Sequence, residues 1–207
     1  MGEKNLIGRV LLVVILVLIE IINFVHTPRT RFSFSNLGYS LNMLAEVWIL
    51  VHLLTNPLKE FSRKFWICSQ LAWNINTLIV VVYWGYLYHL EAYQAELKKS
   101  IILHTEKIVI HVLPALCVML EMKSHGIEYR KHDFLWTIVY LLCYGVVSLI
   151  EIFVAKNVLY PMLTWKDMAT ALFIPIVFLL AFLAHCLGYF TNQFLHPTAS
   201  KLVSKDN

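Results

Sequence analysis

The chain has 207 residues, of which 59% are hydrophobic and only 14% are Asp, Glu, Lys or Arg, and its formal net charge is +4. Soluble domains carry about 25% charged residues, so this composition excludes a soluble globular domain and predicts an all-α integral membrane protein. Basic residues that anchor loops at a membrane account for the small positive charge, and no nucleic-acid partner is expected.

Six apolar runs follow one another along the chain, and a helix of roughly 20 residues suffices to cross a bilayer. They cover residues 6–24, 41–54, 65–88, 101–122, 134–154 and 169–194. The first run is also compatible with a cleaved signal peptide, but no small-x-small cleavage site follows it. The sequence therefore predicts a polytopic transmembrane helix bundle of about six spans over residues 1–195 and a polar C-terminal tail over residues 196–207.

The distribution of Lys and Arg orients this predicted bundle. With six spans, the loops that share a side with the two termini carry more Lys and Arg than the loops on the other side. Because cytoplasmic loops favour Lys and Arg, both termini are predicted in the cytosol. The sequence does not distinguish an endomembrane from the plasma membrane or the mitochondrial inner membrane.

Ionisable residues inside the predicted spans are the candidates for function. A charged side chain at the bilayer centre costs at least about 2.5 kcal/mol, so such residues normally face the bundle interior. His104, Lys107 and His111 are spaced by three and four residues and share one face of the fourth run. His104 and Lys107 can also anchor the helix end by reaching toward water, whereas His111 lies two turns deeper and is the candidate for acid–base chemistry.

The sequence segment HVLPALCVMLEM over 111–122 is accompanied by YW at 83–84 and by VLYPML at 158–163. These segments, in this order and spacing, resemble the androgen-induced protein family of six-span membrane hydrolases over roughly residues 65–195. The resemblance implies a lipid-ester hydrolase that cleaves fatty acid esters of hydroxy fatty acids with a Thr nucleophile in the second helix and a His in the fourth. His111 stands at the position of the family's catalytic His, and an imidazole with a pKa near 6.5 can activate a weak hydroxyl nucleophile.

The nucleophile is the point at which the chain departs from the family pattern. The family's Thr precedes an Asn or Asp by three residues and a Gln by seven, and the match to Asn42 and Glu46 places Tyr39 at that position, with Ser40 beside it. Ser40 is also compatible with a role as the cap of the second helix. The candidate catalytic residues are therefore His111, Ser40 and Tyr39, with Ser33 and Ser35 as more remote candidates for the nucleophile. The candidate substrate-binding residues are Asn42, Glu46 and His104.

Three other interpretations remain open. A chain of this kind can serve as a non-catalytic accessory subunit of a larger membrane complex, with other membrane subunits as partners in place of a fatty-acyl ester substrate. Haem held between helices would use pairs drawn from His52, His111 and His185. Zinc would use His104 and His111 with a carboxylate such as Glu106 or Glu121. The four cysteines form no CxxC motif, and neither a cofactor nor a metal is expected.

Overall fold

The computed structural model describes residues 3–26, 33–55, 61–98, 100–125, 129–160 and 162–196. Every regular element in these ranges is a helix, which confirms the predicted all-α class. The long helices are α1 (Glu3–His26), α2 (Phe34–Thr55), α3 (Arg63–Gly85), α5 (Ile101–His125), α6 (Phe134–Phe153) and α7 (Met168–Leu195). The short ones are η2 (Leu87–His89), α4 (Glu91–Leu97) and η3 (Lys131–Asp133). The predicted tail lies, from residue 197 onward, outside the described residues.

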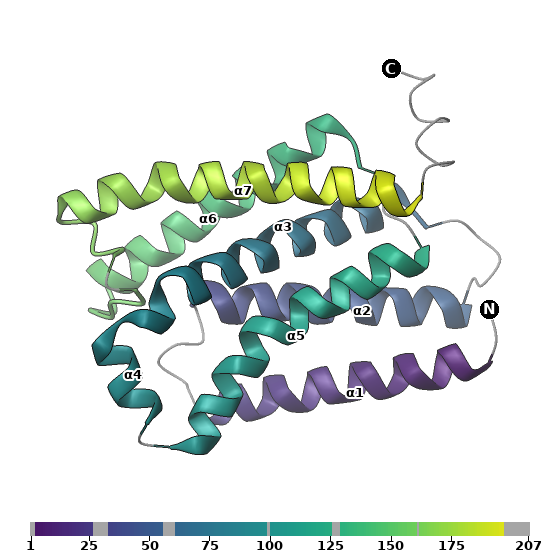
Figure 1. The fold of residues 1–207 in the computed structure, drawn as a ribbon, viewed down its shortest axis with the longest axis horizontal. Helices are drawn as coiled ribbons and strands as arrows, with labels where there is room; N and C mark the ends of the chain where they lie inside the picture. The colour runs from purple at the N-terminus through teal and green to yellow at the C-terminus, as the bar shows by residue number, and fades with distance from the viewer. Residues whose placement is uncertain are drawn as a thin grey trace.

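The long helices run side by side and alternate in direction (Figure 1). The first turn of α1 and the last turn of α7 lie at one end of this bundle, and α4 lies at the other end together with the loop that joins α6 to α7 (Figure 1). The first turn of α2 and the first turn of α5 lie at the same end as α4. Residues near 35, 111 and 160, far apart in the sequence, are thereby brought to one end of the fold.

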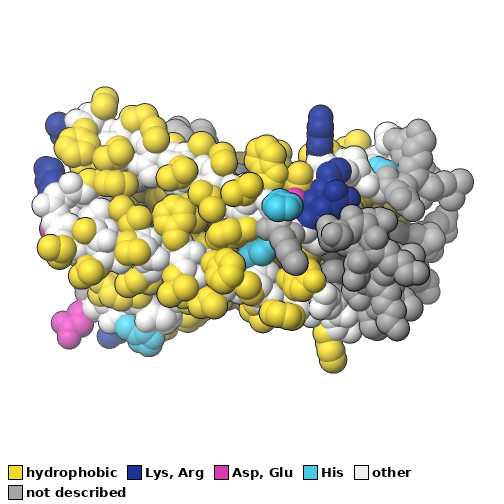
Figure 2. Space-filling model, turned by 90° about the horizontal axis from the view of Figure 1, so that it is seen from above, with side chains coloured by type: hydrophobic (Ala, Val, Ile, Leu, Met, Phe, Trp, Pro, Cys, Tyr) yellow, Lys and Arg dark blue, Asp and Glu magenta, His cyan; other side chains and the backbone are white. Residues whose placement is uncertain are grey.

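Four of the helices are long and apolar enough to cross a membrane: Phe34–Thr55, Arg63–His89, Phe134–Phe153 and Met168–Leu195. Hydrophobic side chains cover the middle of the face seen in Figure 2, and charged side chains gather toward its ends. A soluble protein would bury such a surface, whereas lipid is a favourable neighbour for it. These features support an integral membrane protein.

Helix α2 begins seven residues before the predicted start of the second run. The Ser33 side chain, which precedes the helix, accepts a hydrogen bond from the backbone N–H of Asn36 at 3.4 Å, an interaction that caps a helix N-terminus. Phe34, Leu37 and Leu41 continue the apolar spacing of a helix through this turn. Ser40 consequently lies inside α2 and does not cap it.

Helix α3 is the centre of the bundle and packs against α2, α5, α6 and α7. Its buried polar residues hold the neighbouring helices in register. Asn74 donates to the Thr137 hydroxyl of α6 at 2.8 Å and lies 3.2 Å from the Nδ1 atom of His185 on α7. The Trp73 indole N–H donates to the carbonyl of Ala184, also on α7, at 3.0 Å. Inter-helix bonds of this kind fix the positions of α6 and α7 relative to α3.

A buried ion-pair cluster joins α1, α2 and α5. The Arg9 guanidinium contacts both carboxylate oxygens of Glu121, at 2.8 and 2.9 Å, and lies 3.7 Å from Glu46. All three side chains are nearly or fully buried. Because an isolated buried charge is strongly unfavourable, this arrangement ties the three helices together.

Candidate functional site

The imidazole of His111 is 5% exposed and has a partner on each ring nitrogen. Its Nδ1 atom is hydrogen-bonded to the backbone carbonyl of Lys107, one turn earlier in α5. A carbonyl oxygen only accepts, so Nδ1 carries the proton and Nε2 of the neutral ring is left as an acceptor. This is the tautomer that a general base requires.

The acceptor Nε2 faces the hydroxyl of Ser35. The distance between the Ser35 Oγ and the His111 Nε2 is 2.9 Å, a normal hydrogen bond in which the hydroxyl donates. Ser35 lies in the first turn of α2, where the helix dipole favours negative charge. The pair therefore combines a hydroxyl, a base positioned to remove its proton and a local field that favours an alkoxide.

Tyr160, from the loop between α6 and α7, completes the group. Its hydroxyl lies 3.2 Å from the Ser35 Oγ and accepts a hydrogen bond from the Ser35 backbone N–H at 3.3 Å. Burial of this hydroxyl raises the pKa of Tyr160 above its ordinary value, although its hydrogen bonds with Ser35 oppose the shift. The phenol therefore keeps its proton near neutral pH and can donate it.

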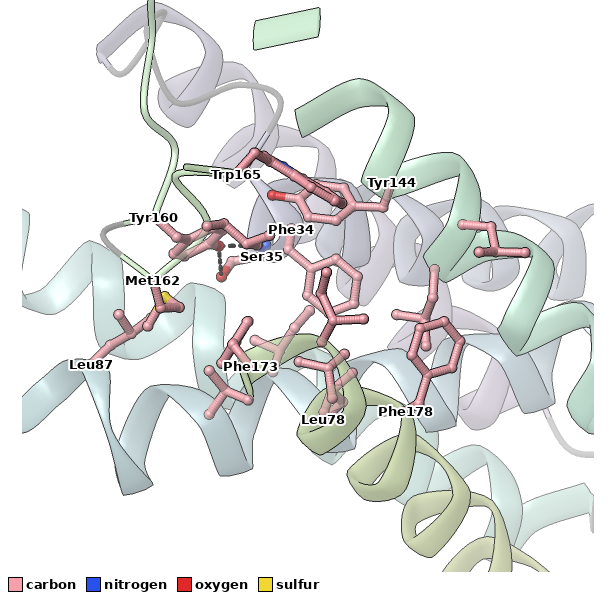
Figure 3. A pocket seen from close by; sticks show the side chains of 18 of the residues that line it. Phe34, Ser35, Leu78, Leu87, Tyr144, Tyr160, Met162, Trp165, Phe173 and Phe178 are labelled. Atoms are coloured by element: carbon pink, nitrogen blue, oxygen red, sulfur yellow. Dashed lines mark hydrogen bonds between the residues drawn. The ribbon is translucent and has the colours of Figure 1, made fainter. Parts of the chain in front are cut away.

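An apolar cavity of about 290 Å³ begins at Ser35 and Tyr160. Its walls come from the start of α2, from α3 and η2, from α6, from the α6–α7 loop and from α7. In Figure 3 Phe34, Leu78 and Phe178 extend the lining away from the Ser35–Tyr160 contact, with Tyr144 and Trp165 on another side. Among the residues that the structure describes, none that lines it is charged. The cavity thus suits a ligand with a hydrocarbon chain and one polar group at its end.

The other sequence-predicted nucleophiles have different partners. The Tyr39 hydroxyl donates to the carbonyl of Leu16 on α1 at 3.0 Å. The Ser40 Oγ lies 2.7 Å from a carboxylate oxygen of Glu20 and 3.0 Å from the carbonyl of Asn36. Both side chains face α1 or their own helix, whereas the structure brings His111 together with Ser35.

The predicted substrate-binding residues lie apart from this pair. Along α2, Asn42 and Glu46 are about 10 Å and about 16 Å from Ser35 by helical rise, and Glu46 belongs to the Arg9 cluster. His104 lies about two turns before His111 on α5, with its ring 6.2 Å from that of Tyr88. Asn42 and Glu46 are buried within the bundle, and His104 lies near the beginning of α5.

Several residues named for haem or zinc binding have other partners in the structure. His111 uses both ring nitrogens within the protein, and the ring of His52 lies against Phe61, with centroids 4.3 Å apart. Glu106 pairs with Lys107, and Glu121 pairs with Arg9. Within the part of the chain that the structure describes, no three His, Cys, Asp or Glu side chains are grouped as metal ligands would be.

Ser35 was a more remote candidate than Ser40 because the match of Asn42 and Glu46 to the family pattern pointed to Tyr39 and its neighbour. The second run was also predicted to begin at residue 41, whereas α2 begins at Phe34. The signal that identifies the true beginning is local. A Ser at position 33 precedes Phe34 and Leu37, which have helical spacing with Leu41. Once the helix begins at Phe34, Ser35 falls in its first turn.

Comparisons with protein-family models, with curated proteins and with solved structures find no match.

Proposed function

We propose that this protein is a membrane lipid-ester hydrolase of the androgen-induced type, which cleaves fatty acid esters of hydroxy fatty acids with Ser35 as the nucleophile and His111 as the base. The observation that carries the proposal is the 2.9 Å contact between the Ser35 Oγ and the His111 Nε2 at the polar end of an apolar cavity. A serine hydroxyl is a weak nucleophile at neutral pH, and an adjacent unprotonated imidazole is the usual means of activating it.

In the first half of the reaction, the Ser35 proton passes to the His111 Nε2 while the Ser35 Oγ forms a bond to the ester carbonyl carbon. The carbonyl π electrons move to its oxygen. The tetrahedral intermediate then collapses: the electron pair on this oxygen forms the carbonyl again, and the bond to the leaving alkoxide breaks. The alkoxide takes the proton from Nε2. The hydroxy fatty acid departs, and the acyl group remains on Ser35 as an ester.

In the second half, water replaces the departed alcohol. His111 removes a proton from water, the resulting hydroxide adds to the acyl carbon, and the Ser35 oxygen leaves with the proton that His111 returns. The products are a fatty acid and the regenerated enzyme. Throughout both halves the Lys107 carbonyl keeps the ring oriented through Nδ1.

The negative oxygen of each tetrahedral intermediate needs hydrogen-bond donors. The Tyr160 hydroxyl, 3.2 Å from the Ser35 Oγ, is a candidate donor beside the proposed nucleophile. Donors of this kind contribute roughly 10²- to 10³-fold to the rate of an acyl-transfer enzyme.

The family pattern fits Ser35 in one respect and departs from it in another. Asn42 stands seven residues after Ser35, where the family has a Gln, so an amide occupies that position two turns along the same face. Gly38 stands three residues after Ser35, where the family has an Asn or Asp. Position 38 of this chain therefore has no side-chain amide or carboxylate to match that of the family.

The proposal includes six membrane spans with both termini in the cytosol. Helices α1 and α5 have 24 and 25 residues, lengths of about 36 Å and about 37 Å, and they run beside the four apolar helices. The excess of Lys and Arg in the loops on the side of the termini supports this orientation. The Ser35–His111 pair would then lie toward the membrane surface opposite the cytosol.

Labelling with a fluorophosphonate probe tests the nucleophile. We expect the full chain in lipid nanodiscs to be modified at Ser35, the Ser35→Ala variant to be unlabelled and the Ser40→Ala variant to be labelled like the wild type. Turnover of a branched fatty acid ester should be lost in Ser35→Ala and in His111→Ala. Modification of Ser40 or Tyr39 instead would contradict the assignment. A wild-type chain that is neither labelled nor active, and that co-purifies with stoichiometric membrane proteins, would establish the accessory-subunit interpretation.

A further inference from the structure

The cavity that begins at Ser35 reaches the outer surface of α6. Two of its lining residues, Leu142 and Val146, are 57% and 56% exposed. Across from them, Val177 and Phe178 of α7 line the cavity and are only partly exposed. Because a lining residue that is more than half exposed marks an open side, the cavity opens between α6 and α7.

This open side lies on two of the helices that are long and apolar enough to cross a membrane. Along α6, an exposed Leu or Val at mid-helix therefore meets hydrocarbon in the bilayer. A ligand that enters between α6 and α7 comes from the lipid phase. Water-soluble ligands would have to cross the hydrocarbon first.

The polarity of the lining defines which part of a lipid fits. The hydroxyls of Ser35 and Tyr160 are hydrogen-bonded to each other at one end, and the wall formed by α6 and α7 is aliphatic and aromatic. The lining, over the described part of the chain, contains no cationic side chain to hold a phosphate or a carboxylate. The occupant that satisfies both features is an uncharged acyl chain with its ester carbonyl at Ser35.

The wall near the opening is built by a constrained tryptophan. Trp165 has a φ of 57°, a left-handed conformation that is unfavourable for an aromatic residue. Its indole N–H donates to the Ser148 hydroxyl at 2.9 Å, and its backbone N–H donates to the Thr170 hydroxyl at 3.0 Å. A Cβ atom at Gly145 would lie 3.9 Å from the Trp165 ring, an ordinary contact distance, so the ring lies beside α6 at Gly145.

We propose that the opening between α6 and α7 is a lateral entrance through which the acyl chain of a membrane-dissolved ester enters the cavity from the bilayer. The identity of the occupant as an ester rests on the proposed function, whereas the binding of an acyl chain at this place does not. Val146 stands at the entrance, and a large ring at this position would close it.

Photo-crosslinking tests the entrance without catalysis. A fatty acid methyl ester with a diazirine in its chain is added to the Ser35→Ala variant in lipid nanodiscs, and peptide mass spectrometry locates the adducts. We expect adducts on cavity residues such as Leu78 and Phe178, and at least a fivefold decrease of these adducts after Val146→Trp. The matched control is Val139→Trp, since Val139 is 48% exposed, lies two turns earlier on the same face of α6 and does not line the cavity.

The results separate the two proposals. Equal cavity labelling in the Val146→Trp and Val139→Trp variants, or adducts spread evenly over the lipid-facing helices, would overturn the entrance. Leu142→Trp provides a second plug if Val146→Trp loses its monodisperse elution on size-exclusion chromatography. In the Ser35-containing protein, Val146→Trp should lower the ratio of long-chain to short-chain ester turnover about tenfold. Cavity labelling in a protein that hydrolyses no ester would refute the proposed function and leave the entrance intact.

Discussion

The ring of Tyr83 on α3 stacks on the imidazole of His111 on α5, with centroids 3.5 Å apart and planes inclined by 15°. The face of the imidazole is thus covered while its edge makes both hydrogen bonds. A ring held on its face and by both nitrogens has little freedom to leave the orientation in which Nε2 meets Ser35. If His111 is the base of the proposed hydrolase, Tyr83 is therefore a positioning residue.

Removal of this stacking is expected to affect turnover more than affinity. In a Tyr83→Leu variant the imidazole can tilt, and misplacement of a catalytic group by about 1 Å costs on the order of 10²-fold in rate. We expect kcat for a branched fatty acid ester to fall by about 10- to 100-fold with a smaller change in KM. Tyr83→Phe keeps the ring and should retain most of the activity. A Tyr83→Phe variant as impaired as Tyr83→Leu would assign the effect to the hydroxyl instead.

The Tyr160 hydroxyl should matter for the rate and for stability at high pH. Tyr160→Phe removes the donor beside Ser35, and a decrease of kcat by about 10²-fold is expected. Burial raises the pKa of Tyr160 in the folded protein, whereas the unfolded chain has a pKa of about 10 at this residue. At a pH between the two values, the folded protein keeps the phenolic proton and the unfolded chain has lost it. The contribution of the protonated Tyr160 to the free energy of unfolding is therefore fully present below about pH 10, and it is lost as the pH rises toward the pKa of Tyr160 in the folded protein.

The pH dependence can be measured as the unfolding temperature of the detergent-solubilised protein. The wild type should lose stability above about pH 10, and the Tyr160→Phe variant should lose less of it over the same interval. Parallel curves for the two proteins would show that Tyr160 does not carry this dependence.

Gly188 is expected to tolerate no side chain. A Cβ atom there would overlap the Tyr129 hydroxyl and the Trp73 indole, and the indole is fixed by its bond to the Ala184 carbonyl. Gly188→Ala should therefore destabilise the protein by about 1–3 kcal/mol, the usual effect of overpacking. Gly85→Ala is the control, because nothing lies within 4 Å of a Cβ at Gly85. A thermal shift no larger than that of Gly85→Ala would contradict this packing.

The Arg9 cluster yields a stability prediction that is separate from the site. Arg9→Leu leaves Glu46 and Glu121 buried without their cation, and loss of one partner from a buried ion pair costs about 3–5 kcal/mol. We expect a large decrease in the unfolding temperature of the variant. The triple variant Arg9→Leu, Glu46→Gln, Glu121→Gln removes the uncompensated charge and should recover part of the loss. No recovery would indicate that packing of the Arg9 side chain, and not its charge, supports α1.

The sequence located most of the long helices well and misplaced the beginning of α2. Apolar runs placed α5, α6 and α7 within a few residues of their observed ends, because each is bounded by polar residues. The beginning of α2 was misplaced because Ser33, Ser35 and Asn36 make its first turn polar. That polar turn is stabilised by its cap, which a hydropathy pattern does not register.

The site itself depends on contacts that no local pattern encodes. Ser35 is 76 residues from His111 and 125 from Tyr160 in the sequence. Neighbouring positions on a helix differ by about 100° in direction, so a match to a family motif that is shifted by a few residues points to another face. Tyr39 and Ser40 were favoured in this way, although α1 is the neighbour they face. His111 could be singled out from the sequence because an ionisable side chain deep in an apolar run normally faces the bundle interior, and its ring is indeed buried.

The main-chain carbonyl of Lys107 occupies the place that a carboxylate holds in the familiar three-residue charge arrangement of soluble esterases. A carbonyl carries no formal charge, so the orienting group adds no anion to a region of low dielectric constant. Because the orienting group belongs to the main chain, substitution of side chains would not identify an acidic residue with this role. Sensitivity should appear instead where a substitution distorts the turn between Lys107 and His111, since the peptide backbone is what selects the imidazole tautomer.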